Sequence, residues 1–172
     1  MAGVQGVDMS DAQFGYLRHT PWKPTFDWVP NITQAADQIN SWHEDYPLRV
    51  TATIRALETA WLYDLNLIGK EILLDLHMTM FGDKEFAGRW RDVGVIVGSH
   101  APPTYEQIPS LMDSLVQAYS GLDFGTSLLE AWYTDFETIH PFQDGNGRVG
   151  GVIVAAFSNR LHPQKGWLAP NQ

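Results

Sequence analysis

The chain has 172 residues and a formal net charge of −9 at pH 7; 44% of its residues are hydrophobic, 18% are charged and none is a cysteine. This composition is typical of a globular protein with a sizeable core, and it excludes a disordered chain, a disulfide framework and thiolate chemistry. The acidic charge argues against a nucleic-acid groove as the main function, although a local basic spot could still bind phosphate.

The sequence shows no membrane or export signal. No uninterrupted apolar run approaches the roughly 20 residues of a membrane-spanning helix. Residues 1–13 lack the basic and apolar segments of a signal peptide. We therefore expect a cytoplasmic protein, with neither a membrane nor a nucleic acid as its partner.

The first part of the chain is rich in proline. Residues 18–31 hold three prolines and two tryptophans, and proline at this density prevents a helix. The sequence predicts an extended arm over residues 1–30. A single domain is expected to span residues 31–172.

Apolar residues at helical spacing account for most of the domain. A first helix is expected from about residue 31 or 33 to residue 44, with a break at Pro47. The stretch 48–81 is helical in pattern, and Gly69 either divides it into two helices or is tolerated inside one at a cost of about 1 kcal/mol. Three more amphipathic stretches follow, at 108–119, 128–139 and 149–157. The simplest explanation of each apolar stripe is core packing.

The middle of the chain has a different pattern. Residues 89–100, RWRDVGVIVGSH, place short aliphatic residues between glycines, which is typical of a short strand. Two prolines, Pro102 and Pro103, end this segment. The sequence therefore predicts an all-α fold, a helical bundle with one short β element.

The stretch HPFQDGNGRVGG, residues 140–151, joins the last two predicted helices. Gly145 and Gly147 allow positive φ angles and a close approach of the backbone. The free N–H groups at the start of the last helix favour an anion such as a phosphate. Arg148 supplies a charged fork for that phosphate, and the side chain of Asn146 can donate an amide N–H.

Two groups beside this anion site can take part in chemistry. Asp144 is a hard oxygen ligand of the kind that Mg²⁺ takes alongside substrate phosphates. His140 can accept a proton at neutral pH. A base, a metal ligand and an anion cradle together indicate phosphoryl or nucleotidyl transfer to a hydroxyl. The structural alternatives are a core or capping histidine at His140 and a simple turn residue at Asp144. The other five histidines, such as His77 and His100, lack partners at metal spacing and are expected to be structural.

The stretch resembles the signature of the Fic family, His-x-Phe-x-Asp/Glu-Gly-Asn-Gly-Arg-x-x-Arg. Seven of the eight specified positions agree, and the eighth, an arginine in the family, is Gly151. Family members carry a β-hairpin flap before the motif, often entered by Gly-x-x-Arg and followed by prolines, and residues 88–97 with Pro102-Pro103 are similar to it. The resemblance covers residues 50–160 and implies the Fic fold, a helical bundle with a short β-hairpin flap.

The resemblance also implies an activity. Fic enzymes usually act as protein adenylyltransferases, which transfer AMP from ATP to a Ser, Thr or Tyr hydroxyl of a target protein. By this resemblance His140 removes the proton of the hydroxyl, Asp144 holds Mg²⁺ across the α- and β-phosphates, and Arg148 holds the outer phosphates.

Two further sets of residues take roles from the same resemblance. The oxyanions are cradled by Gly145, Asn146 and Gly147. The target's backbone pairs, as an added strand, with the flap residues Val95, Ile96 and Val97. An ordinary buried hairpin explains the flap residues nearly as well.

The partners follow from that activity. Mg²⁺ is the expected cofactor, ATP the substrate and a protein the acceptor. An antitoxin-like regulatory chain is a further candidate partner, as for a toxin or effector.

Gly151 departs from the family pattern. The arginine usual there reaches the γ-phosphate of ATP and pairs with a glutamate of an inhibitory helix, and the chain holds no acceptable copy of that helix motif, Ser/Thr-x-x-x-Glu-Gly/Asn. Loss of one charge-assisted phosphate contact costs roughly 1.5–3 kcal/mol. The sequence thus predicts weakened use of ATP and a gain in ATP affinity and rate for Gly151→Arg. The alternatives are another phosphate-containing donor, a catalytically impaired module that binds nucleotide or protein, and a phosphotransferase of the Doc type.

Overall fold

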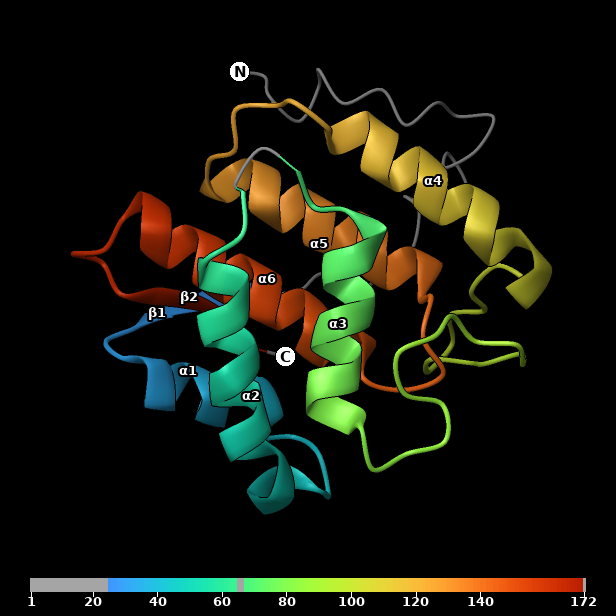
Figure 1. Cartoon of the computed structure of the whole chain (residues 1–172), viewed down its shortest axis with the longest axis horizontal. Helices are drawn as coiled ribbons and strands as arrows, with labels where there is room; N and C mark the ends of the chain where they lie inside the picture. The colour runs from blue at the N-terminus through green and yellow to red at the C-terminus, as the bar shows by residue number, and fades with distance from the viewer. Residues whose placement is uncertain (1–24, 65–66, 172) are drawn as a thin grey trace.

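The computed structural model describes residues 25–64 and 67–171, and within these ranges the chain is mostly helical (Figure 1). The prediction of an all-α class is confirmed, with a two-stranded antiparallel sheet beside the helices. The elements are β1 (Thr25–Val29), α1 (Ile32–Asn40), α2 (Tyr46–Trp61), α3 (Lys70–Phe81), the 3₁₀ helix η4 (Tyr105–Gln107), α4 (Ile108–Tyr119), α5 (Thr126–Ile139), α6 (Asn146–Leu161) and β2 (Trp167–Asn171).

Helix α6 is the centre of the bundle. It packs against α2, α5, β2 and α1, and more weakly against α3 (Figure 1). The eight residues from Val149 to Ala156 are all buried, as is Phe157 after them. A helix that is apolar on every face is one enclosed by other elements, so the segment after the motif is fixed from all sides.

The helix ends follow from local sequence. Asn31 caps α1 by accepting a hydrogen bond from the Gln34 backbone N–H at 2.9 Å. Pro47 lies in the first turn of α2, where its missing N–H costs nothing. It therefore starts a helix, and α1 ends at Asn40, several residues before the predicted end. Gly69 precedes α3 and divides the stretch 48–81 into two helices, one of the two predicted outcomes.

The sheet joins the two ends of the described chain. Strand β1 pairs antiparallel with β2, with Thr25 opposite Asn171 and Val29 opposite Trp167. Strand β1 is the described part of the predicted arm, and residues 1–24 lie outside the described residues. Because β2 also packs on α1 and α6, the sheet covers one side of the central helix.

The predicted flap is a minimal hairpin. Val97 and His100 exchange two backbone hydrogen bonds, of 3.0 and 2.9 Å, around a turn in which Gly98 has a φ of 60°. The segment before it, residues 92–96, forms no strand. Ile96 is 79% exposed and Val97 is 40% exposed, so the alternative of an ordinary buried hairpin does not hold.

Among the described helices, none has both the length and the apolar composition needed to cross a membrane.

Candidate active site

The motif loop begins where α5 ends. His140 caps α5 with φ 55° and ψ 62°, a left-handed conformation that among the described residues no other non-glycine residue adopts. Such a backbone costs free energy and persists only where its surroundings hold it. The turn at His140 therefore needs contacts that hold the backbone around it.

Arg91 supplies these contacts from the segment that leads into the flap. Its Nε donates to the His140 carbonyl oxygen at 2.7 Å, and its Nη2 donates to Pro103 O at 2.6 Å. The Arg91 backbone N–H donates to Pro141 O at 2.8 Å. The side chain is 4% exposed, and burial lowers its pKa. One buried guanidinium thus ties the end of α5 to both ends of the flap segment.

The ring of His140 is held in one orientation. Its Nδ1 lies 3.1 Å from the Glu137 carbonyl oxygen, so Nδ1 carries the proton and Nε2 holds the lone pair. In the described part of the chain, Nε2 has no hydrogen-bond partner. Burial, with the nearby charges of Arg91 and His100, lowers the pKa of His140 to about 4, against the opposing effects of the Glu137 carbonyl and Asp144. The side chain is 15% exposed, so the neutral ring keeps an opening to solvent.

His77 fixes the second half of the loop from α3. The Gly88 backbone N–H donates to its Nδ1 at 2.9 Å, so its Nε2 carries the proton and donates to Asp144 O, also at 2.9 Å. The ring stacks on Phe142 with centroids 3.9 Å apart and an angle of 6° between the planes. Burial lowers the pKa of His77 to about 4, which keeps the ring neutral. The structural role expected for His77 is thus the support of the motif loop.

Asp144 is an exposed residue of the motif loop. Its side chain is 59% exposed. One carboxylate oxygen, Oδ1, accepts the Gly145 backbone N–H at 2.8 Å and lies 3.5 Å from Arg148 Nη2. The other oxygen has no hydrogen-bond partner in the described part of the chain. The described residues form no cluster of three metal-ligating side chains.

Asn146 closes the loop on itself. Its Oδ1 accepts the Phe142 N–H at 2.7 Å and its Nδ2 donates to Phe142 O at 2.8 Å. The side chain is 2% exposed. The structure therefore differs from the expected donation of this amide to a phosphate, because the amide is already engaged. What Asn146 offers an anion is its backbone N–H, in the first turn of α6, where N–H groups have no intrahelical acceptor.

The two glycines of the cradle differ in environment. Gly145 has a φ of 88°, and a Cβ atom there would lie 2.4 Å from Phe81 Cε2, so only glycine fits. Gly147 is half-buried, and its carbonyl oxygen is 3.5 Å from the hydroxyl of Tyr133. The start of α6 therefore lies on the ring of Phe81.

Arg148 points inward. Its side chain is 2% exposed, its Nη1 donates to Asp45 Oδ1 at 2.7 Å, and its Cζ lies 4.7 Å from the centroid of the Phe81 ring. Its Nε is buried and has no hydrogen-bond partner among the described residues. Asp45 Oδ2 accepts a second bond, of 2.8 Å, from Arg49 Nε. Burial opposes ionisation of Asp45, but these bonds outweigh it and lower its pKa. Asp45 is thus the ion-pair partner of the Arg148 guanidinium, the group that was expected to bind the outer phosphates.

Gly151 does not face the motif loop. A Cβ atom there would lie 3.0 Å from Pro170 Cγ and 3.3 Å from Ile39 Cγ1. Both neighbours are buried, in β2 and α1. An arginine here would enter the core, because α1 and β2 cover this side of α6, so this packing does not support the predicted gain in ATP affinity for Gly151→Arg.

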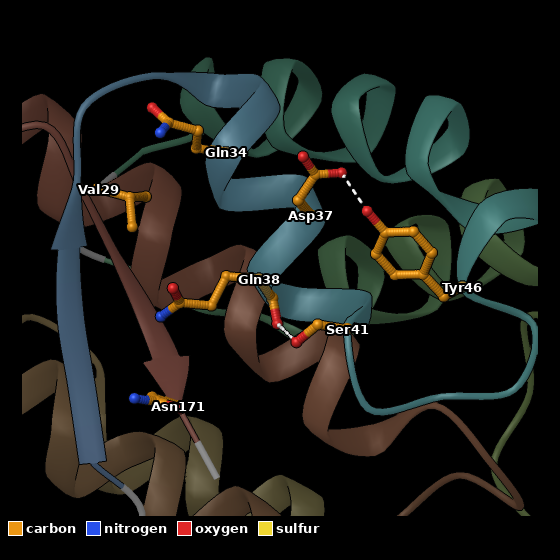
Figure 2. A pocket seen from close by; sticks show the side chains of 7 residues that line it. All are labelled: Val29, Gln34, Asp37, Gln38, Ser41, Tyr46 and Asn171. Atoms are coloured by element: carbon orange, nitrogen blue, oxygen red, sulfur yellow. Dashed lines mark hydrogen bonds between the residues drawn. The ribbon is translucent and has the colours of Figure 1, made fainter.

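Two surface hollows lie away from the motif. One, of about 340 Å³, lies between α1, the start of α2 and the sheet. In Figure 2, Asp37 and Tyr46 point toward one another across it and form a hydrogen bond of 2.9 Å. The other, of about 450 Å³, is apolar and lies beside Trp61 and Trp167. Neither is lined by a residue of the motif.

Comparison with known families decides the identity of the fold. A family model described as "Fic/DOC family" matches residues 67–158, more than half of the chain and including the whole motif. The chain belongs to the Fic/DOC family. Members of the family typically transfer AMP or other nucleotide-phosphate groups to proteins. The matched range agrees with the similarity expected over residues 50–160, except that it begins after α2.

Solved structures show the same Fic fold. A Fic family protein from Desulfovibrio desulfuricans G20 is 21% identical, with a TM-score of 0.59 over 95% of this chain. A Fic domain containing signaling protein from Bacteroides thetaiotaomicron VPI-5482 is 16% identical, with a TM-score of 0.58 over 91% of this chain. This chain spans 57% and 63% of the lengths of those two proteins.

The site combines residues that the sequence predicted with residues that it did not. Asp144 is exposed and His140 is largely enclosed on the same loop, and the flap is attached beside His140 through Arg91. The functional assignments missed Arg91, whose signal was the Gly-x-x-Arg pattern. They also missed Asp45, which lies 103 residues before Arg148 and gave no signal of its role.

Proposed function

We propose that this Fic chain is a protein adenylyltransferase that transfers AMP from ATP to a Ser, Thr or Tyr hydroxyl. The observation that carries the proposal is the hydrogen bond between His140 Nδ1 and the Glu137 carbonyl oxygen. It fixes the neutral tautomer that leaves Nε2 able to accept a proton. The held backbone around His140 and the first turn of α6 then place a base and a set of N–H donors on one short loop.

The chemistry follows from these groups. His140 Nε2 takes the proton of the target hydroxyl, the hydroxyl oxygen attacks the α-phosphorus of ATP, and pyrophosphate leaves. The N–H groups of Gly147 and Arg148 lie in the first turn of α6, where they have no intrahelical acceptors and can donate to the phosphate oxygens as charge develops.

Asp144 fits the role of a magnesium ligand. A lone exposed carboxylate with one free oxygen suits Mg²⁺, which is usually held by one or two carboxylates together with substrate phosphates. The bound ion would neutralise charge on the phosphates. The contact between Asp144 Oδ1 and the Gly145 N–H orients the carboxylate for this task.

The flap would present the acceptor. Ile96 and Val97 are exposed, and residues 92–96 have no strand partner in the described structure. A segment of the target protein can pair with such an edge as an added strand. Arg91 and His100 connect this edge to the end of α5, the latter through a contact of 3.2 Å between His100 Nε2 and Thr138 O. A bound acceptor is thereby carried close to His140.

A second candidate is transfer from another phosphate-containing donor. The observation that favours it is the ion pair of Arg148 with Asp45, because the outer phosphates of ATP would have to displace Asp45. A donor that makes no use of Arg148 would leave this pair intact.

Labelling of a cell lysate tests both candidates. The protein is incubated with Mg²⁺ and α-³²P-ATP, and in parallel with the other three labelled triphosphates. We expect labelled protein bands with ATP that disappear in His140→Ala and Asp144→Ala and persist in His162→Ala, a histidine at the far end of α6. Transfer of label from γ-³²P-ATP would instead indicate phosphotransfer. Full labelling by His140→Ala would refute the proposed base.

A further inference from the structure

We propose that Glu137 is a positioning residue for the transfer, because its carboxylate is the counter-charge for the imidazolium that forms on His140. This rests on the proposed function, in which His140 is the base. Glu137 belongs to α5 and was not among the residues assigned a role from the sequence.

The geometry places two groups of Glu137 at one ring nitrogen. Its backbone carbonyl oxygen is 3.1 Å from His140 Nδ1, and its side-chain Oε1 is 3.9 Å from the same atom. Both side chains are largely enclosed, with 9% of Glu137 and 15% of His140 exposed. A small rotation of the carboxylate would bring Oε1 within hydrogen-bond distance of the Nδ1 proton.

The Glu137 carboxyl group makes no hydrogen bond with the described residues that would explain its burial. Oε1 is buried and has no hydrogen-bond partner in the described part of the chain. A buried polar atom without a partner is costly, and in native proteins such atoms are rare. An apolar side chain would fill this position at lower cost if packing were its only purpose. The unsatisfied oxygen is therefore best explained by a partner that forms during the reaction.

Burial sets the resting charges of the pair. It raises the pKa of Glu137 to about 8 and is the main cause that lowers the pKa of His140 to about 4. Near neutral pH, Glu137 is therefore mostly protonated and His140 is a neutral but weak base. Because Oε1 lies 3.9 Å from Nδ1, a charge on one group should favour the opposite charge on the other, and we expect the two groups to titrate as a pair.

Ionisation of Glu137 makes the base stronger. The hydroxyl O–H bond then breaks, its proton forms a bond to His140 Nε2, and Nδ1 keeps its own proton. Glu137 keeps its charge of −1 and His140 becomes +1, so the net charge of the two side chains changes from −1 to zero. A nearby negative charge favours the charged form of a histidine, so we expect the transfer rate to rise as Glu137 ionises.

Other charged groups also act on His140, and the test must leave them unchanged. Arg91 and His100, from the flap segment, lower its pKa, and Asp144, from the motif loop, raises it. All three remain in Glu137→Gln, which keeps the size of the side chain and removes its charge. Glu130 is a matched control, because it lies seven residues earlier on α5, about 10 Å along the helix, and burial raises its pKa as well.

The kinetic test is the pH profile of kcat/KM between pH 6 and 9.5. For the unaltered chain and for Glu130→Gln we expect a rate that rises with an apparent pKa near 8. Glu137→Gln should lose this rise and be about tenfold slower at pH 9, since a weaker base transfers the proton less well. A rate that falls by the same factor at every pH, with the rise retained, would show a merely structural role and overturn the proposal.

A second measurement does not depend on activity. NMR spectra of chain labelled in its histidines, with the His140 signals identified by their loss in His140→Ala, should show a step in the His140 ring shifts near pH 8. The step should disappear in Glu137→Gln and persist in Glu130→Gln. A titration step in a chain that shows no transferase activity would refute the proposed function but still support the coupling between Glu137 and His140. Absence of the step in the unaltered, folded chain would overturn the pair.

Discussion

Replacement of Gly151 by arginine tests how α6 is packed. A Cβ atom at this position would already lie 3.0 Å from Pro170 and 3.3 Å from Ile39, closer than side chains normally approach. Overpacking of a core costs about 1–3 kcal/mol, and a buried charge without a partner costs about 3–5 kcal/mol more. The higher helix propensity of arginine than of glycine offsets about 1 kcal/mol of this loss. We expect Gly151→Arg to lower the free energy of unfolding by about 5 kcal/mol.

Urea unfolding followed by circular dichroism measures this change, and Tm should fall by about 10–20 °C. Gly151→Ala is the control: its gain in helix propensity is set against contacts that must yield by only a few tenths of an ångström, so it should change stability by no more than about 1 kcal/mol. If Gly151→Arg were as stable as the unaltered chain and bound ATP more tightly, position 151 would face the nucleotide and the packing described here would be wrong.

Three further predictions concern the motif and its supports. Gly145→Ala should lower the free energy of unfolding in urea by at least about 2 kcal/mol, because it combines a left-handed backbone with a clash against Phe81. Gly94→Ala, with open space around it, should change this free energy by no more than about 0.5 kcal/mol; equal losses in the two variants would contradict the packing of Gly145 on Phe81. The folded pKa of His77, about 4, lies below its unfolded value of 6.5, so the unfolded state binds the proton more tightly. The chain should therefore lose about 3 kcal/mol of stability from His77 as pH falls from 6.5 to 4. His77→Gln should remove that part of the slope in unfolding measured against pH, and an unchanged slope would refute it. Asp45→Asn should tighten ATP binding about tenfold in calorimetry, since Arg148 loses its nearest charged competitor; weaker binding would mean that Asp45 positions Arg148 for the phosphate.

Local patterns predicted most of the helices and the motif. Within the described residues, the apolar periodicity located the helical stretches to within a few residues, because each helix buries apolar residues in the core. It left open whether the stretch 48–81 forms one helix or two. The ordered motif from His140 to Arg148 located the loop between α5 and α6, since its glycines and its histidine have spacing that depends on neighbouring residues alone.

Contacts between distant segments were not predictable in the same way. The pairing of Arg148 with Asp45 and the pairing of β1 with β2 join residues far apart in the chain, and no periodicity encodes them. The surroundings of Gly151 were not predictable for the same reason. Its position on the helix was foreseen, but the elements that cover it, α1 and β2, were not known to lie there.

Because α1 and β2 cover one side of α6, they limit how far the domain can be truncated. The segment that matches the family model, residues 67–158, leaves out α1, α2 and β2. Helix α1 and strand β2 bury Gly151, and Asp45 is the residue that directly precedes α2. An excised fragment limited to the matched segment would present an apolar flank of its central helix to water and leave the Arg148 guanidinium without its partner. A truncation that seeks the smallest stable domain should therefore keep both β1 and β2.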